Sequence, residues 1–588
     1  MTDTATMTIY YTPSGISEAG ATLWGALKRG GRVLALNEED CLALREQGIE
    51  AVSYQQQAPP RTSRTLWSEA RSRWAQRIAP VCFSPAYCLE GMPALWCAKL
   101  ESLRIAVFWE QLRRLAVEQR IQTVLAQPHY IDMIRAIACT DVPLVGALPL
   151  RLRLPMGLKD SLKLLGVRPL PRWPHLTGPV ARDAGELAVF LPLDPSGRDI
   201  NCRCTLATAK AWKQRGKAGL IVAATPQIAR FFSDAPFPVL PMRLPRTTPS
   251  APLRELARLL QRQAQPFALR GNTAAIDTTA WTLARHLLAD SYLQYRFWKR
   301  LLEHYRPDAL FTVPDTVPVA RVAIAAAAAK GIPSITANSV MMDDHPMSTD
   351  LAAAYACALG PSRAAVYKSL PGVKDAHVHV TGIPGWDDIA AGNPESVILP
   401  AGRKRLIIYA TEHTSLRQVE MTLEILTAFG ASHGEFGVIV RPHAEDDAQT
   451  LRRIIHQRGA EAWMIVERTT PLKDLLARAD GVIVGFSSVG AMAICAGKPV
   501  ISVNLVATGR GGSNYVETGA ALAADTPQQL LDSLEQIADG AAGLSLAKGR
   551  ENYLSTVMAN PADSSRRAAE MISFAIEDSQ NRPRTLRA

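Results

Sequence analysis

The stretch ADGVIVGFSSVGAMAICAGKPVIS, residues 479–502, decides the fold of this chain. Its first apolar run, GVIV, predicts a short buried strand, and the glycine and serine residues that follow predict a turn. AMAICAG then has helical composition, and PVIS begins another apolar run. A strand, a helix and a second strand at this spacing form a βαβ unit, so we predict two parallel strands of one sheet.

The same alternation continues on both sides of that stretch and predicts a doubly wound parallel sheet in the C-terminal third. The further predicted strands are LIIYA (406–410), GVIV (437–440), MIV (464–466) and PVISV (499–503). The predicted helices cover residues 415–431, 445–458, 471–479, 488–496, 526–538 and 565–577.

Two further α/β regions precede this domain. From Gly185 the runs GELAVFLPL, AGLIVAAT, FPVLPM and ALFTV predict strands. The alanine-rich segment after ALFTV predicts a helix, and the Gly-Ile-Pro turn that follows it leads into another predicted strand. In the first 180 residues TIYYTP, GRVLALN, AVSYQ and QTVLAQP predict strands as well. We place the crossing between the later two domains at HVHVTGIPGWDD (377–388), where glycine and proline cluster. The predicted domains are residues 1–180, 181–395 and 396–588.

A faint internal echo links the first two regions. The segment that begins FWEQLRRL at Phe108 runs loosely parallel to the one that begins FWKRLLEH at Phe297. A duplicated half-domain would explain the echo, and so would chance recurrence of a helix-strand-helix pattern.

Composition indicates a soluble globular protein, with 47% hydrophobic and 20% charged residues among 588. The N-terminus carries no signal-peptide pattern and no long uncharged apolar run is present, so we expect a cytoplasmic protein. Nine dispersed cysteines without a C-x-x-C pair indicate reduced, mostly buried thiols. The net charge of +11 favours anionic partners. The chain lacks the zinc-finger, RNP and basic-heptad patterns of nucleic-acid-binding proteins, so we do not expect a nucleic acid among these partners.

The segment LRLRLPMGLKDSLKLLGVRPLPRWPHL (150–176) is basic and contains leucine, proline and tryptophan. Such a segment suits peripheral contact with the inner membrane or with a lipid-linked acceptor. A solvated basic linker is the alternative interpretation.

Polar side chains follow the predicted strands of the C-terminal domain, at the sheet edge where open parallel sheets bind ligands. Thr411 and Glu412 follow the first strand, and Arg441 and His443 follow the second. The cation and the imidazole suit a phosphate leaving group. Ser487 and Ser488 stand at a helix start, where backbone amides bind phosphate or carboxylate groups. Helix capping is the alternative role for the threonine and serine residues.

RPH, the opening stretch and YVETGAALAADTPQQLLDSL together resemble the donor-binding domain of GT-B glycosyltransferases of bacterial capsule and surface polysaccharide synthesis. Glycerophosphate polymerases and non-hydrolysing UDP-N-acetylglucosamine 2-epimerases share related patterns. The resemblance covers residues 305–540 well and 185–305 loosely, and residues 1–180 match no family. It implies a fold of two Rossmann-like lobes with a donor cleft between them, plus an additional N-terminal α/β region for acceptor or partner recognition.

The resemblance also implies roles for single residues. Sialyltransferases and some Kdo transferases carry a His-Pro motif that contacts the donor phosphate and a Ser-Ser motif that contacts phosphate or carboxylate. His443, Ser487 and Ser488 occupy the comparable places, although this chain has Pro442 before the histidine rather than after it. The implied donor is a CMP-activated acidic sugar or a UDP-sugar. Glu517, within YVETG, is expected to accept hydrogen bonds from the ribose hydroxyls.

An inverting transfer needs a base near the acceptor hydroxyl. Asp315, directly after the ALFTV strand, is our candidate, and Asp343, Asp344 and His345 form the rival one. We expect no metal and no cofactor, because GT-B enzymes neutralise the leaving phosphate with protein cations and helix dipoles. The glycine-rich loop Gly509–Ser513 is a weak candidate to close over the donor.

The sequence therefore predicts a glycosyltransferase that moves a sugar from a nucleotide-sugar to a surface glycan, a lipid-linked sugar or a protein. An epimerase or a polyol-phosphate transferase on the same fold is the first alternative. A non-catalytic scaffold that retains the GT-B fold is the second, since function depends on the site and not on the fold.

Overall fold

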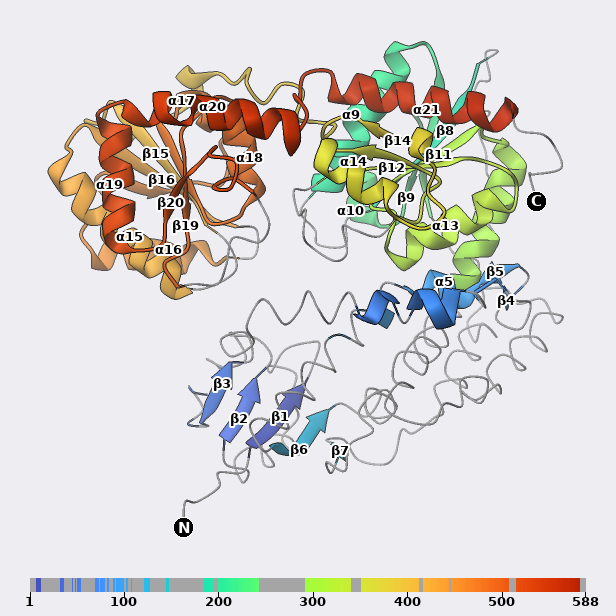
Figure 1. Cartoon of the computed structure of the whole chain (residues 1–588), viewed down its shortest axis with the longest axis horizontal. Helices are drawn as coiled ribbons and strands as arrows, with labels where there is room; N and C mark the ends of the chain where they lie inside the picture. Colours follow the sequence, from blue (N-terminus) through green and yellow to red (C-terminus); the bar gives the residue numbers. More distant parts are fainter. Residues whose placement is uncertain are drawn as a thin grey trace. The chain divides into compact units, whose positions relative to one another are not determined.

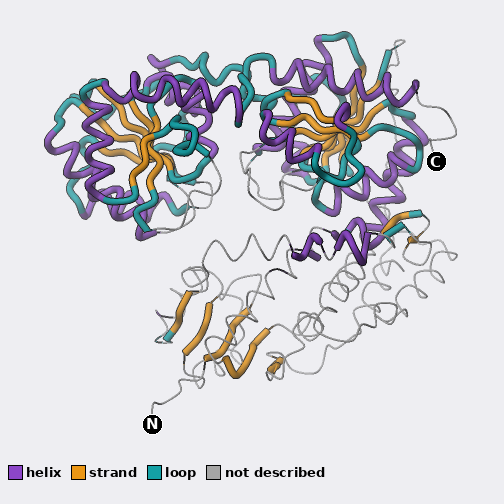
Figure 2. Tube along the Cα trace, viewed as in Figure 1, coloured by secondary structure: helices purple, strands orange, loops and turns teal. Residues whose placement is uncertain are grey.

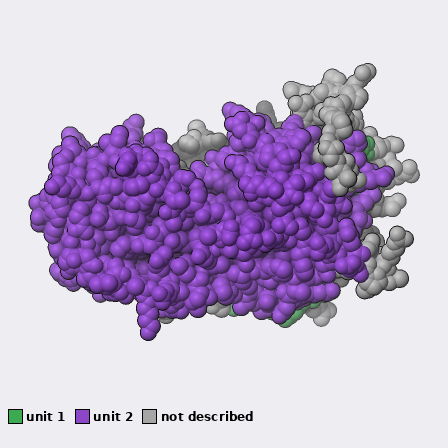
Figure 3. All heavy atoms as spheres, turned by 90° about the horizontal axis from the view of Figure 1, so that it is seen from above, with its two compact units in different colours: residues 1–177, 243–300, 317–326 green, residues 178–242, 301–316, 327–588 purple. Residues whose placement is uncertain are grey.

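A computed structural model of the chain describes most residues from 185 onward and shorter segments before them (Figure 1). Two compact units divide the chain, coloured separately in Figure 3: residues 1–177, 243–300 and 317–326 form the first, and residues 178–242, 301–316 and 327–588 form the second. The described residues are 7–11, 32–35, 45, 48, 50–53, 69–72, 74–79, 82–83, 88–89, 91–99, 102–103, 107, 121–126, 144–146, 185–193, 199–242, 291–339, 351–411, 416–443, 446–506 and 514–581.

The first unit contains a five-stranded, fully parallel sheet with the strand order β3-β2-β1-β6-β7. The four strands predicted in the first 180 residues are present, and the short strand β7 adds one that the sequence analysis did not predict. The strands are β1 (Met7–Tyr11), β2 (Arg32–Ala35), β3 (Ala51–Ser53), β6 (Ile121–Ala126) and β7 (Leu144–Gly146). The π-helix η2 (Trp74–Ile78), the antiparallel pair β4 (Cys88–Leu89) and β5 (Met92–Pro93), and helix α5 (Ala94–Cys97) also belong to this unit.

The second unit contains two larger parallel sheets, with helices on both faces of each (Figures 1 and 2). The seven-stranded sheet has the order β10-β9-β8-β11-β12-β13-β14. Its strands are β8 (Leu187–Pro192), β9 (Ala218–Ala223), β10 (Val239–Pro241), β11 (Ala309–Val313), β12 (Ser334–Ala337), β13 (Tyr355–Ala358) and β14 (Val378–Val380). The helices along this part of the chain are α9 (Ile200–Gln214), α10 (Pro226–Phe231) and α14 (Pro361–Lys368), with short 3-10 turns η9 (Asp375–His377) and η10 (Pro394–Ser396). Helix α13 (Pro318–Ala328) follows β11 in the chain, and most of it belongs to the first unit.

The six-stranded sheet has the order β17-β16-β15-β18-β19-β20. Its strands are β15 (Arg405–Ala410), β16 (Phe436–Arg441), β17 (Met464–Val466), β18 (Gly481–Val484), β19 (Val500–Val503) and β20 (Leu522–Ala524). The helices are α15 (Leu416–Ser432), α16 (Ala448–Gln457), α17 (Leu472–Arg478), α18 (Ser488–Cys495), α19 (Pro527–Ala538) and α20 (Ala541–Thr556), and α21 (Ser564–Asn581) ends the described chain. Every strand and helix predicted for residues 396–588 is present, but α21 packs into the hydrophobic core of the seven-stranded sheet. Strand β20 and helix α20 were not predicted here, nor were β13 and β14 in the seven-stranded sheet.

The central strand β15 shows why the six-stranded sheet needs helices on both faces. Leu406 and Ile408 are fully buried in one hydrophobic cluster, whereas Ile407 and Tyr409 are buried in a second cluster. Side chains alternate between the two faces of a strand, so the two clusters lie on opposite faces of the sheet. A strand with both faces buried reads as a continuous apolar run, and for that reason LIIYA was recognisable in the sequence.

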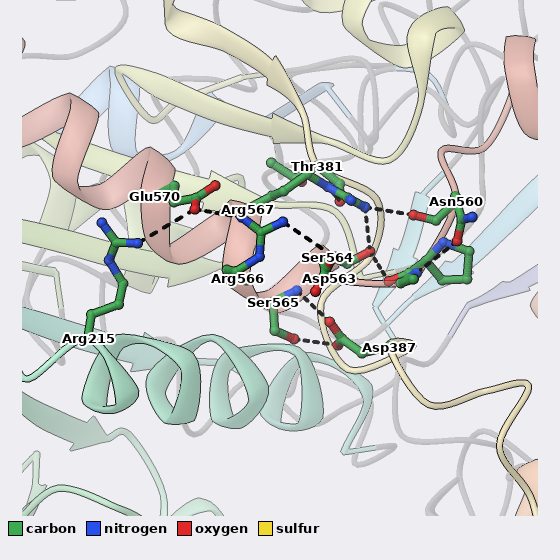
Figure 4. A network of polar contacts seen from close by, with 12 residues as sticks. Arg215, Thr381, Asp387, Asn560, Asp563, Ser564, Ser565, Arg566, Arg567 and Glu570 are labelled. Carbon is green, nitrogen blue, oxygen red and sulfur yellow. Dashed lines mark hydrogen bonds and ion pairs between the residues drawn. The ribbon is translucent and has the colours of Figure 1, made fainter.

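The chain crosses between the two larger sheets twice, and the two crossings are bonded to each other (Figure 4). Asp387, in the crossing that follows β14, accepts hydrogen bonds from the amide (2.8 Å) and the hydroxyl (2.5 Å) of Ser565, in the first turn of α21. Arg567 donates from Nε to the Thr381 carbonyl at 2.9 Å. The first amides of a helix have no acceptor within the helix, so Asp387 supplies one and joins the crossings.

This arrangement confirms the predicted α/β class: the chain has two Rossmann-like domains with parallel sheets and an additional parallel α/β region before them. The seven described cysteines form no disulfide with one another, and six of them are buried. No helix of the described residues is long and apolar enough to cross a membrane.

Candidate functional site

The strand order of the six-stranded sheet locates the candidate site. From β15 the chain adds β16 and β17 on one side, then returns to add β18, β19 and β20 on the other. Ligands bind beyond the carboxyl ends of the strands where the order reverses, which here means the ends of β15 and β18. The turns after β15, β16 and β18 carry six of the residues predicted from the sequence.

Thr411 follows β15 and is buried with 2% of its surface exposed. Its hydroxyl bonds to Asp446, and it also accepts the His443 amide at 2.9 Å. The Asp446 carboxylate accepts the same amide at 3.1 Å. Thr411 therefore fixes the backbone that carries His443, together with an aspartate that sequence reasoning missed. Glu412 lies outside the described residues, so its predicted role stays a prediction.

Arg441 ends β16 and directs its guanidinium towards the end of β17, where Nη1 donates to the Glu467 carbonyl at 3.4 Å. Burial lowers the pKa of Arg441, and the Glu467 carboxylate opposes that shift. The positive charges of Arg203, near the start of α9, and of Arg468 lower the pKa of Arg441 further. Burial and neighbouring cations both disfavour the charged form of Arg441, so a bound anion would stabilise it.

Arg468 is a site residue that the sequence analysis did not predict. Its Nη2 donates to the His443 carbonyl at 3.3 Å and to the Asp446 carbonyl, and the residue is exposed. It lies two residues beyond the MIV strand, so the rule that singled out Arg441 would also have found it. Glu467, between strand and arginine, is tied back by Thr469 and Thr470; burial alone would raise the pKa of Glu467, but these hydrogen bonds lower it.

The turn after β18 leads into α18 as predicted. Ser487 is the N-cap of this helix, and its hydroxyl accepts the Val489 amide at 3.3 Å. Ser488 begins the helix, is half-buried, and its hydroxyl makes no hydrogen bond within the described part of the chain. The capping interpretation therefore holds for Ser487, while the Ser488 hydroxyl stays available to a ligand.

Glu517 lies in a turn between β19 and β20 that is ordered by its own hydrogen bonds. The Thr518 hydroxyl donates to the Asn514 carbonyl at 2.7 Å, and the Ala520 amide donates to the Tyr515 carbonyl at 2.8 Å. Glu517 itself is exposed, and its carboxylate has no partner among the described residues. The geometry leaves this carboxylate able to accept hydroxyl hydrogen bonds, as its predicted role requires.

Asp315 belongs to the seven-stranded sheet, where the order reverses between β8 and β11. It follows β11 and is 5% exposed, and its Oδ2 accepts the amides of Ala352 (2.5 Å) and Ala353 (2.9 Å). These bonds fix the carboxylate and the segment that leads into β13. Its role as a base stays a prediction. The rival group of Asp343, Asp344 and His345 lies outside the described residues, as do Gly509–Ser513 and residues 150–176.

Within the described segments, no three His, Cys, Asp or Glu side chains come close enough together to hold a metal ion. The proposed metal independence and the absence of a cofactor stay predictions. The residues around the ends of β15, β16 and β18 offer guanidinium cations, the Ser488 hydroxyl and the backbone amides at the start of α18. These groups suit a phosphate or carboxylate ligand.

No protein family model matches this chain, and no curated protein matches it. Among solved structures, a putative UDP-N-acetylglucosamine 2-epimerase from Listeria monocytogenes aligns over 67% of this chain and 98% of its own length, at 11% identity and a TM-score of 0.48. A glycosyltransferase from Rickettsia africae aligns over 67% and 100%, at 11% identity and 0.45. The UDP-GlcNAc 2-epimerase from Neisseria meningitidis, bound to UDP-GlcNAc, aligns over 66% and 100%, also at 11% and 0.45. At this identity and TM-score, none of these proteins assigns a reaction to this chain.

Proposed function

We propose that this chain is a glycosyltransferase that binds a nucleotide-sugar at the carboxyl ends of β15, β16 and β18. One observation carries the proposal: Arg441 and Arg468 flank the turn of His443 beyond β16 and β17, and the α18 start presents Ser488 after β18, where the strand order reverses. Guanidinium groups and helix-start amides are the groups that bind a nucleotide phosphate.

In the proposed reaction an acceptor hydroxyl attacks the anomeric carbon of the sugar, and the bond from that carbon to the phosphate oxygen breaks. Asp315 takes the proton of the acceptor hydroxyl. Arg441 and His443 stabilise the negative charge that develops on the departing phosphate, which is the step where a preorganised cation contributes most. Glu517 holds the ribose. The acceptor is a surface glycan, a lipid-linked sugar or a protein.

Calorimetric binding of CMP, CDP, UDP and GDP to the full chain tests the donor site. We expect one of these nucleotides to bind, and Arg441→Met to weaken it about tenfold or more, since a charge-assisted hydrogen bond contributes about 1.5–3 kcal/mol. Arg478→Met is the matched control, because Arg478 lies before β18, at the opposite edge of the same sheet. If no nucleotide binds, the proposal is wrong and the scaffold interpretation replaces it.

A second pair of variants tests the α18 start. Ser487→Ala removes the N-cap of α18, and Thr526→Ala removes the N-cap of α19, which follows the edge strand β20. Each loss costs about 1 kcal/mol of stability, so both variants should unfold slightly earlier. Only Ser487→Ala should lower the affinity for the nucleotide. If both variants bind it with equal affinity, the phosphate binds elsewhere.

Incubation of the chain with the nucleotide-sugar that corresponds to the bound nucleotide then distinguishes the possible reactions by their products. With water as the acceptor, a transferase releases free sugar and free nucleotide, which nuclear magnetic resonance detects. A change of sugar configuration with the nucleotide still attached would establish the epimerase alternative instead. Transfer of a polyol phosphate would appear as release of a nucleoside monophosphate from the matching donor.

A further inference from the structure

The start of α18 contains an irregularity at the residue that the proposed function uses. In an α-helix the amide of Ala491 would donate to the Ser487 carbonyl, four residues earlier. Here the Tyr515 hydroxyl lies between them: it donates to the Ser487 carbonyl at 2.6 Å and accepts the Ala491 amide at 3.2 Å. The Ser487 carbonyl also accepts the Gly490 amide at 2.9 Å, a bond that spans three residues instead of the four of a regular α-helix. One hydroxyl therefore sets the geometry of the first turn.

The surroundings of Tyr515 leave its side chain little room to move. It is fully buried, and its ring packs directly on the backbone of Gly490, where an added Cβ would lie 2.7 Å from Tyr515 Cε2. The backbone carbonyl of Tyr515 accepts the amides of Ala520 (2.8 Å) and Ala521 (3.0 Å). A buried hydroxyl with two partners at these distances has little freedom, so it determines where the serine turn lies.

We propose that Tyr515 is the positioning residue of the phosphate site: through its hydroxyl it holds the Ser487–Ser488 turn and the first amides of α18 in the orientation that receives the nucleotide phosphate. The inference rests on the proposed function. It also joins two predicted contacts, since Tyr515 lies two residues before Glu517 in the same turn. The tyrosine fixes the distance between the phosphate-binding turn and the carboxylate expected to hold the ribose.

Removal of the hydroxyl should change the turn and leave the packing intact. In Tyr515→Phe the ring still fills its site, but the Ser487 carbonyl and the Ala491 amide lose their common partner. The simplest relaxation closes the regular bond between these two groups, which reorients Ser488. We expect the affinity for the bound nucleotide to fall about tenfold, corresponding to about 1.4 kcal/mol.

Tyr553→Phe is the matched control, because Tyr553 is equally buried and its ring centroid lies 5.7 Å from that of Tyr515. Both variants remove one buried hydroxyl, so both should lower Tm. Calorimetry with CMP, CDP, UDP and GDP should show weaker binding for Tyr515→Phe alone. Gly490→Ala is an independent variant that displaces the ring without changing the tyrosine, and it should weaken the same nucleotide.

The outcomes separate the inference from the proposed function. If the wild type binds a nucleotide, Ser487→Ala weakens it and Tyr515→Phe leaves it unchanged, the positioning role is wrong and the donor site stands. If Tyr515→Phe and Tyr553→Phe lose affinity equally, the effect is one of general stability and the inference is also wrong. If the wild type binds no nucleotide, the proposed function fails and the inference fails with it.

Discussion

Two glycines on helix α20 predict opposite effects of the same substitution. A Cβ added at Gly549 would lie 1.9 Å from the carbonyl oxygen and 2.0 Å from the carbonyl carbon of Gly519, in the turn that carries Glu517. A Cβ added at Gly543, which is exposed on the same helix, would meet nothing within 4 Å. Gly549→Ala should therefore destabilise the chain, and Gly543→Ala should stabilise it.

The magnitudes follow from the contacts. Carbon atoms pack at about 3.5–4.0 Å, so the contact at Gly549 is short by about 1.5 Å. The atoms that must yield are backbone, and overpacking of this kind costs about 1–3 kcal/mol. Alanine returns about 1 kcal/mol through its helix propensity, which leaves a net loss of up to about 2 kcal/mol. At Gly543 only the propensity gain of about 0.5–1 kcal/mol remains.

Thermal unfolding of the full chain, followed by circular dichroism, measures both effects. Large domains shift by about 2–4 °C for each kcal/mol, so Tm should fall by up to about 8 °C in Gly549→Ala and rise by about 1–4 °C in Gly543→Ala. The reasoning is refuted if Gly549→Ala raises Tm as Gly543→Ala does, because α20 would then not pack against the Gly519 turn. Gly549→Ala should also weaken nucleotide binding, since that turn holds Glu517.

Two further predictions concern stability and thiol chemistry. Asp387→Ala should lower Tm, because it removes the acceptor at the start of α21 and costs about 1–2 kcal/mol; Asp388→Ala, which breaks only the exposed ion pair with Lys473, should change Tm by less than about half as much. Equal shifts in a melting experiment would contradict the role of Asp387. Burial raises the pKa of Cys97 and Cys357 from 9.0 to about 12. A folded-state pKa above the unfolded value gives stability that is complete below pH 9 and is lost as pH rises towards 12, so alkaline unfolding should begin above pH 9. In the native protein these two thiols should resist a thiol reagent at pH 8, and rapid labelling of either cysteine would show that it is accessible.

The accuracy of the sequence predictions follows the burial of the strands. LIIYA at 406–410 and GVIV at 481–484 are buried on both faces and read as uninterrupted apolar runs. Two of the strands that escaped prediction, β13 (YACA) and β20 (LAA), are four and three residues long and carry alanine, whose small side chain gives a weak strand signal. Helix α20 escaped because its glycines oppose helix prediction, although Gly549 is needed for the close approach to Gly519.

The candidate site was predictable where position along the chain decides the role. Arg441, His443 and Ser487 were chosen as candidates because each lies at or after the end of a buried strand, and the carboxyl ends of parallel strands meet at one edge. Which of these groups face a ligand depends on contacts between distant segments. Thr411 bonds to Asp446, 35 residues away, and so supports the His443 turn from behind.

Strand order alone does not decide whether the internal echo at Phe108 and Phe297 reflects a duplication. The echo pairs β6 with β11, and each is the fourth strand along the chain in its sheet, hydrogen-bonded to the first: β6 to β1 and β11 to β8. Duplication requires this correspondence. The six-stranded sheet has the same order, with β18 bonded to β15, and carries no echo of either segment. Because all three sheets share one order, the order reflects the general way in which a doubly wound sheet is built. The support for duplication is therefore the residue pattern that begins at Phe108 and Phe297, and the sheets add only that the paired strands hold equivalent places.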